Sequence, residues 1–232
     1  MTPTIPAPLV ATPSAFDPEG RLAFEPEPHR YSLRGPAGDR PLISVTQAIE
    51  SALAGTLGEE HWTEEARLRG QYVHEAILLH SQDDLDESTL HPLVAPFFSA
   101  YLRFRAERRV EILHLETPIF DEEYGYGGTF DLLGRLLDEP VVAFAGRPVL
   151  DLIDVKSGSL PYWVRWQLAG YRRPIQRAYP DALVRPWVLH LRADGTYRLV
   201  PAWAGHLVLS NRRDEQDWLS ILRVACIKRD QA

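Results

Sequence analysis

Strand-like apolar segments in the middle of the chain constrain its fold most. The segments 111–120, 127–137 and 148–155 have strand character, and a turn-forming Asp-Glu-Glu-Tyr-Gly connection separates the first two. Helical patterns at about 92–109 and 161–178 lie on either side of them. Strands that are enclosed by helices in this order are typical of an α/β (α+β) protein with a central mixed β-sheet flanked by helices.

The flanking segments extend the same architecture. The segments 29–33 and 41–45 surround a Gly-Pro-Ala-Gly-Asp turn, and 183–192 and 196–200 surround Ala-Asp-Gly, so each pair is expected to form a hairpin. Further helices are predicted from their capping residues: a short one after Ser44 or Thr46, one from Thr63 to about His80, and one over 211–228 capped by Asn211.

Length and proline content define the domain organisation. The chain has 232 residues, which is enough for one domain with extensions. Residues 1–20 are rich in proline without periodicity, and we interpret them as an irregular leader. Residues 21–232 are expected to form a single domain.

Charge and cysteine content exclude several classes of protein. The net charge of −7 does not favour nucleic-acid binding by the chain as a whole, so any such role needs a local basic surface. The single cysteine, Cys226, cannot form an internal disulfide, a cysteine-rich zinc site or a cysteine-ligated iron–sulfur cluster, and is expected to be a packed core thiol. Without a signal peptide or an apolar run of membrane-spanning length, the protein is expected to be cytoplasmic.

Asp154 and Lys156 form the clearest candidate site. Side chains alternate faces along a strand, so these two residues project on one side, whereas Ile153 and Val155 point into the core. A carboxylate and an ammonium group therefore lie together at the end of a buried strand. For this triplet alone, a surface salt bridge is the more common explanation.

Asp131 strengthens the case for a site. It is the only charge in the apolar run from Gly127 to Gly134, and a carboxylate in such a place must be paired, hydrogen-bonded or bound to a metal. Carboxylates on adjacent strands, Asp131 and Asp154, form an oxygen-ligand site suited to Mg²⁺ or Mn²⁺. The backbone carbonyl of Val155 could add a further oxygen. Asp151 lies on the opposite face of its strand and is not counted as a ligand.

Four short blocks occur in order along the chain. They are Gly70-Gln71-Tyr72-Val73-His74, Gly128-Thr129-Phe130-Asp131, Asp154-Val155-Lys156 and Gln167-Leu168-Ala169-Gly170-Tyr171, with Ser44-Val45-Thr46 before them. In this order the chain resembles the PD-(D/E)xK nuclease superfamily, within it the RecB-like and phage-exonuclease-like branch. The resemblance implies a restriction-endonuclease-like core.

The resemblance also implies roles for the residues of these blocks. His74 is similar to the helix-borne metal ligand of the family and shares a helical face with Gly70, where glycine permits a close backbone approach. Gln167 and Tyr171 are four residues apart on one helix face and would support the active site: the glutamine near the lysine, the tyrosine towards the DNA or the site. Glu116 is either an additional metal ligand or an exposed strand residue.

The chemistry expected of such a site is phosphodiester hydrolysis. A divalent ion held by His74, Asp131 and Asp154 would activate a water and neutralise phosphate oxygens. Lys156 would act as base or as electrostatic stabiliser, and both roles stay open, as does the use of one metal or two.

A local basic surface answers the objection from net charge. Between Ser157 and Pro180 there is no acidic residue, and Arg165, Arg172 and Arg173 (with Arg177) are expected to contact phosphates together with Tyr171. Nearby aromatic residues could stack on bases or simply pack in the core, the latter being favoured for the tryptophans: Tyr162, Trp163 and Trp166.

The function expected from the resemblance is that of a Mg²⁺- or Mn²⁺-dependent DNA exonuclease acting at ends in recombination, repair or phage replication. A restriction-type or structure-specific endonuclease is the first alternative, and a non-catalytic nucleic-acid-binding protein is the second. Because Cys226 is alone, the iron–sulfur cluster of some relatives is not expected. The polarity of digestion, DNA or RNA as substrate, a homo-oligomer and a recombination partner protein all stay open.

Overall fold

The computed structural model describes residues 14–26, 29–55, 63–139 and 147–231. Most of the predicted leader, residues 1–13, lies outside these ranges. The helices and strands follow one another as β1 (Leu22–Glu25), β2 (Arg30–Leu33), β3 (Arg40–Ser44), α1 (Val45–Leu53), α2 (Glu64–Ser81), a short 3₁₀ turn (Glu87–Thr89), α3 (Ala95–Glu107), β4 (Val110–Asp121), β5 (Tyr126–Leu136), β6 (Val149–Lys156), α4 (Val164–Ala178), β7 (Leu183–Leu191), β8 (Tyr197–Pro201) and α5 (Leu207–Asp230).

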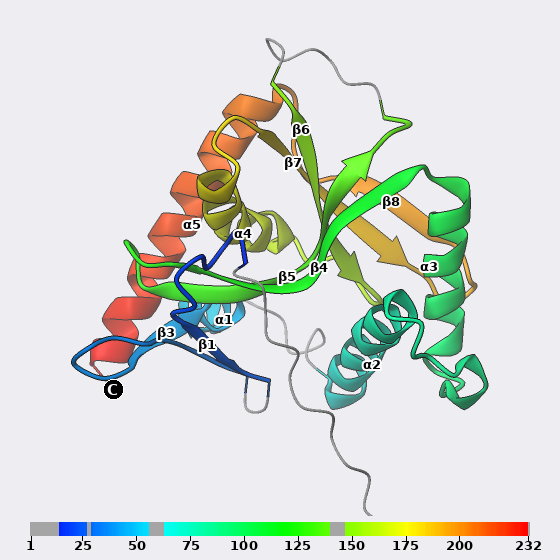
Figure 1. The fold of residues 1–232 in the computed structure, drawn as a ribbon, viewed down its shortest axis with the longest axis horizontal. Helices are drawn as coiled ribbons and strands as arrows, with labels where there is room; N and C mark the ends of the chain where they lie inside the picture. The colour runs from blue at the N-terminus through cyan, green and yellow to red at the C-terminus, as the bar shows by residue number, and fades with distance from the viewer. Residues whose placement is uncertain (1–13, 27–28, 56–62, 140–146, 232) are drawn as a thin grey trace, which may run out of the picture.

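The strands form one mixed sheet, shown in Figure 1. Its order is β1-β2-β3-β5-β6-β7-β8, and β4 pairs with the remaining edge of β5. The pairs β3–β5 and β6–β7 are parallel, and the others are antiparallel. The predicted fold class, a mixed sheet flanked by helices, is confirmed, as are both predicted hairpins.

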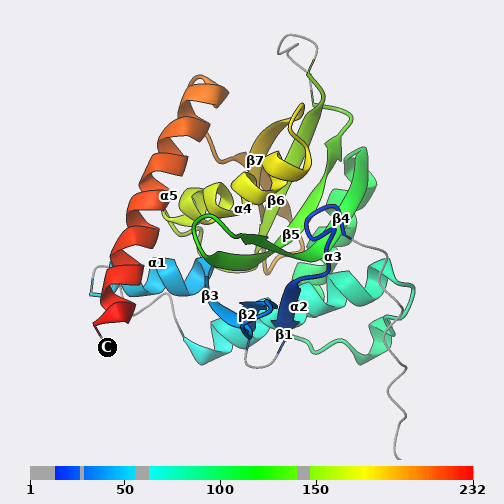
Figure 2. The same cartoon turned by 60° about the vertical axis from the view of Figure 1, so that its left-hand side comes forward.

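Helices cover the two faces of the sheet. On one face α1, α4 and α5 enclose a core around Trp218, Tyr126 and Phe130, and α4 lies between α5 and the sheet (Figures 1 and 2). On the other face α2 and α3 enclose a second core that includes Phe98 and Phe104. Because helices lie on both sides of it, β6 is buried along almost its whole length.

Local sequence signals explain where several helices begin. The Ser44 side chain accepts from the backbone N–H of Gln47, whose own side chain accepts from the Ser44 N–H, so a capping box starts α1. Thr63 accepts from the N–H of Ala66 and caps α2, as predicted. The predicted last helix is confirmed as α5, but its predicted start and its Asn211 cap are wrong, because α5 begins at Leu207 and Asn211 lies inside it.

Two features of the N-terminal region were not predicted from the sequence. The strand β1 was not predicted, and it pairs antiparallel with β2. Phe16, inside the predicted leader, is buried and packs edge-on against His114 at 5.0 Å and Phe130 at 5.4 Å between ring centroids. Residues 14–20 are therefore irregular in backbone but anchored to the core.

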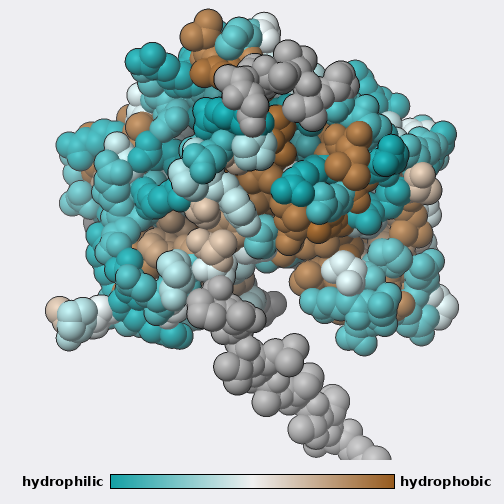
Figure 3. All heavy atoms as spheres, turned by 45° about the horizontal axis from the view of Figure 1, so that its top comes forward, coloured by the Kyte–Doolittle hydropathy of each residue, from teal (hydrophilic) through white to brown (hydrophobic). Residues whose placement is uncertain are grey.

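The surface carries both hydrophobic and hydrophilic residues. Figure 3 shows one face, on which hydrophobic residues gather in the middle and hydrophilic residues surround them. Cys226 is partly buried against the core, in agreement with a packed thiol. Within the described residues, no helix combines the length and the apolar character needed to cross a membrane.

Candidate metal centre

The candidate site lies where β5 changes its neighbour in the sheet. Along one edge β5 pairs with β4. Along the other edge it pairs with β3 at Tyr126 and Gly127 and with β6 from Leu132 onwards. Asp131 lies in the gap between these partners, and its Oδ2 accepts a 2.6 Å hydrogen bond from the backbone N–H of Val155. The Asp131 carboxylate thus accepts the hydrogen bond of a β6 backbone N–H at the point where the β5–β6 pairing ends.

Three potential ligands meet beside this gap. His74 from α2, Glu116 from β4 and Asp131 from β5 place ligand atoms within 4.8 Å of one another. The Nδ1 atom of His74 lies 2.8 Å from Oε1 of Glu116 and 3.7 Å from Oδ1 of Asp131. Glu116, for which the sequence left two readings, therefore belongs to the cluster.

The backbone of Glu116 explains its position. Its φ is +40°, in the left-handed region that side-chain-bearing residues rarely adopt. It lies between two regular pairs of the ladder, Leu115 with Leu132 and Thr117 with Phe130. Strain of this kind persists only where the surroundings hold the residue, and here it accompanies a carboxylate that hydrogen-bonds the partly buried His74.

Asp154 and Lys156 form a second pair at the end of β6. The Lys156 ammonium donates to Asp154 Oδ1 at 3.0 Å and lies 2.8 Å from Oδ2. Only 1% of Asp154 is exposed, and no donor within the described residues has a well-aligned hydrogen bond to its Oδ2. A buried carboxylate oxygen with unused lone pairs is a natural place for a cation.

A hydrogen-bonded chain fixes Lys156 from the other side. Its ammonium also donates to Gln167 Oε1 at 3.2 Å, and Gln167 Nε2 donates to the Tyr171 hydroxyl at 3.0 Å. Gln167 and Tyr171 lie on one face of α4, as their spacing predicts. The structure brings together Lys156, Asp154, Gln167 and Tyr171, next to Asp131.

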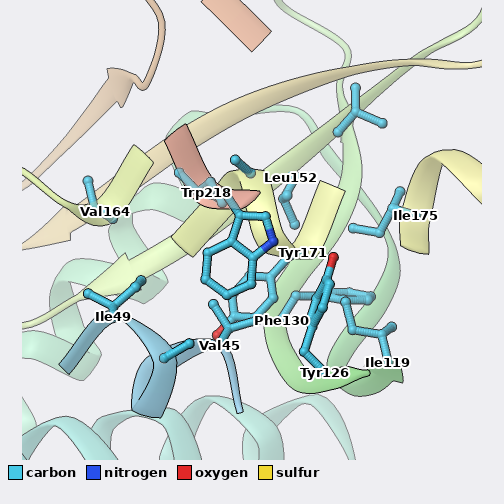
Figure 4. Packing of buried hydrophobic residues seen from close by; sticks show 14 of the residues in the cluster. Val45, Ile49, Ile119, Tyr126, Phe130, Leu152, Val164, Tyr171, Ile175 and Trp218 are labelled. Atoms are coloured by element: carbon cyan, nitrogen blue, oxygen red, sulfur yellow. The ribbon is translucent and has the colours of Figure 1, made fainter. Parts of the chain in front are cut away.

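Tyr171 owes its place to a glycine on β5. A Cβ on Gly128 would lie 2.7 Å from Tyr171 Cε1 and 3.2 Å from Val45 Cγ2, so only glycine admits the ring. Figure 4 shows the ring packed among Trp218, Phe130 and Val45. Only 4% of Tyr171 is exposed, which corrects the expectation that it contacts nucleic acid. Its contact with the site runs through Gln167.

The charges of the site shift the pKa of several groups. Burial lowers the pKa of His74, but the carboxylates of Asp131 and Glu116 outweigh it and raise the pKa to about 9. Burial raises the pKa of Asp154 to about 6, against the opposing effect of Lys156. Burial acts to lower the pKa of Lys156, yet Asp154 and Asp131 raise it overall. His74 and Lys156 are therefore both protonated near neutral pH when no cation is bound.

These residues fit a divalent cation. The cluster offers carboxylate oxygens and one imidazole nitrogen, all of which are protein ligands of divalent cations. The protonated imidazole of His74 supplies the positive charge that the carboxylates would otherwise receive from an ion. Because a ligating histidine must be neutral, binding of a metal would release this proton. Val155 lines the same pocket, and its carbonyl stays a predicted ligand.

A pocket of about 480 Å³ opens beside the cluster. It is lined by His74, Lys156 and Gln167 on the side of the site, and by the start of α2 and the loop after β6 on the other. Gly70 lines it too, but a Cβ there would meet only Ser157 Oγ at 4.0 Å. No other described part of the chain approaches the Gly70 backbone closely, and a close approach by a ligand stays a prediction.

The predicted basic surface on α4 is neutralised. Arg173 lies 3.2 Å from Asp121 and 2.6 Å from Glu215, and Arg172 lies 3.1 Å from Glu215. Arg165 and Arg177 are also paired, with acids of α5 and of the β4–β5 turn: Asp214, Asp217, Asp121 and Glu123. The expected local basic surface is therefore not present on α4, because acids from distant parts of the chain pair with these arginines.

The remaining predicted residues fall outside the cluster. Trp163 is buried, Trp166 is partly buried, and 60% of Tyr162 is exposed. Asp151 is buried on the opposite face, where it accepts hydrogen bonds from Arg185 at 2.7 Å and from Trp187 Nε1 at 2.7 Å. Its exclusion from the ligands agrees with this position.

The sequence analysis missed two arginines that line the pocket, Arg67 and Arg69. Both lie on the helix that carries His74. The spacing of Arg67 to Gly70 and His74 was available in the sequence, because residues three and seven apart share a helical face. Arg69 is one residue from Gly70 and five from His74, so the same spacing does not indicate it.

Comparisons with known proteins leave the family open. No family model matches the chain, and no curated protein matches it. A solved structure from Eubacterium rectale, described as a "Putative exonuclease", is similar at a TM-score of 0.46 with 13% identity, over 79% of this chain and 81% of that one. Chains this distant need not share an activity, so the functional assignment depends on the site itself.

Proposed function

We propose that this protein is a metal-dependent nuclease that hydrolyses phosphodiester bonds. One observation carries the proposal: the acid–histidine cluster of His74, Glu116 and Asp131 lies beside the Asp154–Lys156 pair, and His74 and Lys156 line one pocket. Carboxylates that can hold a divalent cation next to a fixed ammonium group suit a reaction in which negative charge grows on a phosphate.

Each group has a proposed task. His74, Glu116, Asp131 and Asp154 would hold Mg²⁺ or Mn²⁺, which when bound lowers the pKa of water and neutralises phosphate oxygens. Lys156 is held by Asp154 and Gln167 and binds a phosphate oxygen. Because its pKa is raised, we favour the electrostatic role of Lys156 over that of a base in the metal-free protein. Gln167 and Tyr171 position it.

We propose DNA as the substrate and a strand end as the point of attack. The pocket of about 480 Å³ beside the cluster has room for the end of a DNA strand. Recombination, repair or phage replication would supply such ends. An endonuclease of restriction or structure-specific type is the second candidate, and a binding protein without catalysis is the third.

End-labelled single- and double-stranded DNA, incubated with Mg²⁺ or Mn²⁺ and with EDTA, tests the proposal. The chain offers a matched control because it has two lysines, Lys156 and Lys228. Lys228 lies near the end of α5, where its ammonium donates to the Ser51 carbonyl. We expect metal-dependent cleavage that Lys156→Ala abolishes and Lys228→Ala preserves. Cleavage that persists in Lys156→Ala or in EDTA would refute it.

Closed circular DNA separates the two nuclease candidates. An exonuclease leaves the circle intact and degrades the same DNA once it is linear. Cutting of the circle by the wild-type protein, and not by Lys156→Ala, would favour the endonuclease.

A further inference from the structure

Cationic side chains line the pocket beside the cluster, although the protein is acidic. The pocket lining contains Arg67, Arg69, His74 and Lys156, and no carboxylate among the described residues that line it. His74, Lys156 and Arg67 have carboxylate partners outside this lining. The chain as a whole carries a net charge of −7. A concave surface with one sign of charge attracts ligands of the opposite sign, so the occupant of this pocket is expected to be an anion.

Helix α2 orders these charges along the pocket. Arg67, Gly70 and His74 are three and seven residues apart and share one helical face. At about 1.5 Å per residue, Arg67 lies roughly 10 Å and Arg69 roughly 7.5 Å along the helix from His74. Gly70, between them, leaves this face open. The arginines are therefore about one nucleotide away from the residues that would hold the metal.

Arg69 has a buried donor atom without a hydrogen-bond partner among the described residues. Its guanidinium lies over the Phe97 ring, 5.2 Å from the centroid. Its Nε is buried and has no hydrogen-bond partner among the described residues. The Nη2 atom reaches the loop after β6, where a Cβ on Gly158 would lie 3.3 Å from it. A buried donor that lacks an acceptor is costly unless a ligand supplies one.

Arg69 differs in this respect from Arg67 and from the arginines of α4. Arg67 donates to Glu64 at 2.5 Å and to Gln71 at 3.0 Å on its own helix. The α4 arginines are all paired with acids. Arg69 is therefore the principal cation of the pocket, and Arg67 assists it.

We propose that Arg69, assisted by Arg67, forms a second phosphate-binding subsite that holds the phosphate of a nucleotide next to the one being cut. The inference depends on the proposed nuclease function. A guanidinium stacked on an aromatic ring is pre-oriented for bidentate hydrogen bonds to a phosphate. The phosphate belongs either to the strand backbone or to a strand terminus.

Substitution of Arg69 tests the subsite. Arg69→Met keeps the packing on Phe97 without the charge, Arg69→Gln is a second uncharged variant, and Arg69→Lys keeps the charge. Arg103→Met on α3 is the matched control, because Arg103 is an exposed helix arginine paired with Glu107 on its own helix. Circular dichroism melting checks that each variant folds.

The readouts are the Kd for a labelled single-stranded oligonucleotide in Ca²⁺ at several salt concentrations, and KM and kcat in Mn²⁺. For both uncharged variants we expect Kd and KM to rise by about tenfold or more, with kcat within about threefold. The slope of log Kd against log salt should fall by about 0.7, the value for one phosphate contact on a single strand. Arg69→Lys should keep the slope, and Arg103→Met should match the wild type.

Oligonucleotides with a 5′-phosphate, a 3′-phosphate or hydroxyl ends identify the source of the phosphate. If Arg69→Met weakens the binding of only one of the phosphorylated oligonucleotides, the subsite binds that terminal phosphate. If it weakens the binding of all the oligonucleotides equally, the subsite binds a backbone phosphate.

Unchanged KM and salt slope in a folded Arg69→Met or Arg69→Gln variant, with an active wild type, would overturn the subsite alone. A wild type that binds through Arg69 but cuts nothing would overturn the nuclease function instead. A wild type that neither binds nor cuts would overturn both.

Discussion

Gly128→Ala links the packing of the core to the geometry of the site. The added Cβ would lie 2.7 Å from Tyr171 Cε1 and 3.2 Å from Val45 Cγ2, both buried and held by α4 and α1. Relief of such a contact requires the tyrosine ring to shift. The shift breaks the 3.0 Å bond from Gln167 to the Tyr171 hydroxyl and releases the side chain that holds Lys156.

The cost can be worked out from general magnitudes. One extra methyl group in a filled core costs about 1–3 kcal/mol. Alanine has less conformational freedom than glycine in the unfolded chain, which stabilises the folded state by about 0.4–1 kcal/mol. The middle of each range gives a net loss of about 1.3 kcal/mol, or a decrease in Tm of about 3–5 °C for a chain of this size. Because Lys156 loses its second support, kcat should fall by about tenfold or more.

Thermal denaturation followed by circular dichroism measures the stability of the variant, and cleavage of end-labelled DNA measures kcat. Gly70→Ala is the stability control, since its Cβ would meet only Ser157 Oγ at 4.0 Å and alanine favours a helix by about 1 kcal/mol. It should raise Tm. A Gly128→Ala protein with wild-type Tm and kcat would refute the reasoning.

Three further predictions follow from the same contacts. The raised pKa of His74 stabilises the folded protein in EDTA fully below about pH 6.5, and this stabilisation is lost as the pH rises through about 9. Tm in EDTA should therefore fall between these pH values, and Mn²⁺ should remove the fall. A Tm that does not change with pH would contradict the ion pairs of His74. Gln167→Ala should lower kcat by about tenfold with little change in KM, and a larger effect on KM would instead indicate substrate contact. Arg185→Met leaves Asp151 buried without its ion pair and should cost about 3–5 kcal/mol in urea denaturation, with kcat of the folded protein retained; a neutral effect would mean that the pair is not buried as described.

Much of the fold could be predicted because its signals are local. The runs that became β4, β5 and β6 carry their apolar pattern in the sequence, and Ser44 and Thr63 mark helix starts by hydrogen bonds that span three residues. The alternation of side chains along a strand was enough to place Asp154 with Lys156 and to exclude Asp151.

Features that depend on distant partners could not be predicted. The arginines of α4 form a basic stretch in the sequence, but Asp121 and Glu215 reach them only in the folded chain. Asn211 has the residue type of a helix cap, yet its amide donates to the Val184 carbonyl from inside α5. Glu116 joins the cluster through a strained backbone angle, which no pattern of residues reveals.

Binding of Mn²⁺ to the protein, measured by isothermal titration calorimetry, tests the metal centre most directly. Asp131→Asn and Glu116→Gln remove charge from the cluster, and Glu111→Gln removes it from an exposed position on the same strand as Glu116. We predict that Mn²⁺ binds to the wild type and to Glu111→Gln, that proton release accompanies binding, and that the two cluster variants bind at least tenfold more weakly. Equal affinity in all four proteins would contradict the assignment of this cluster as a metal site.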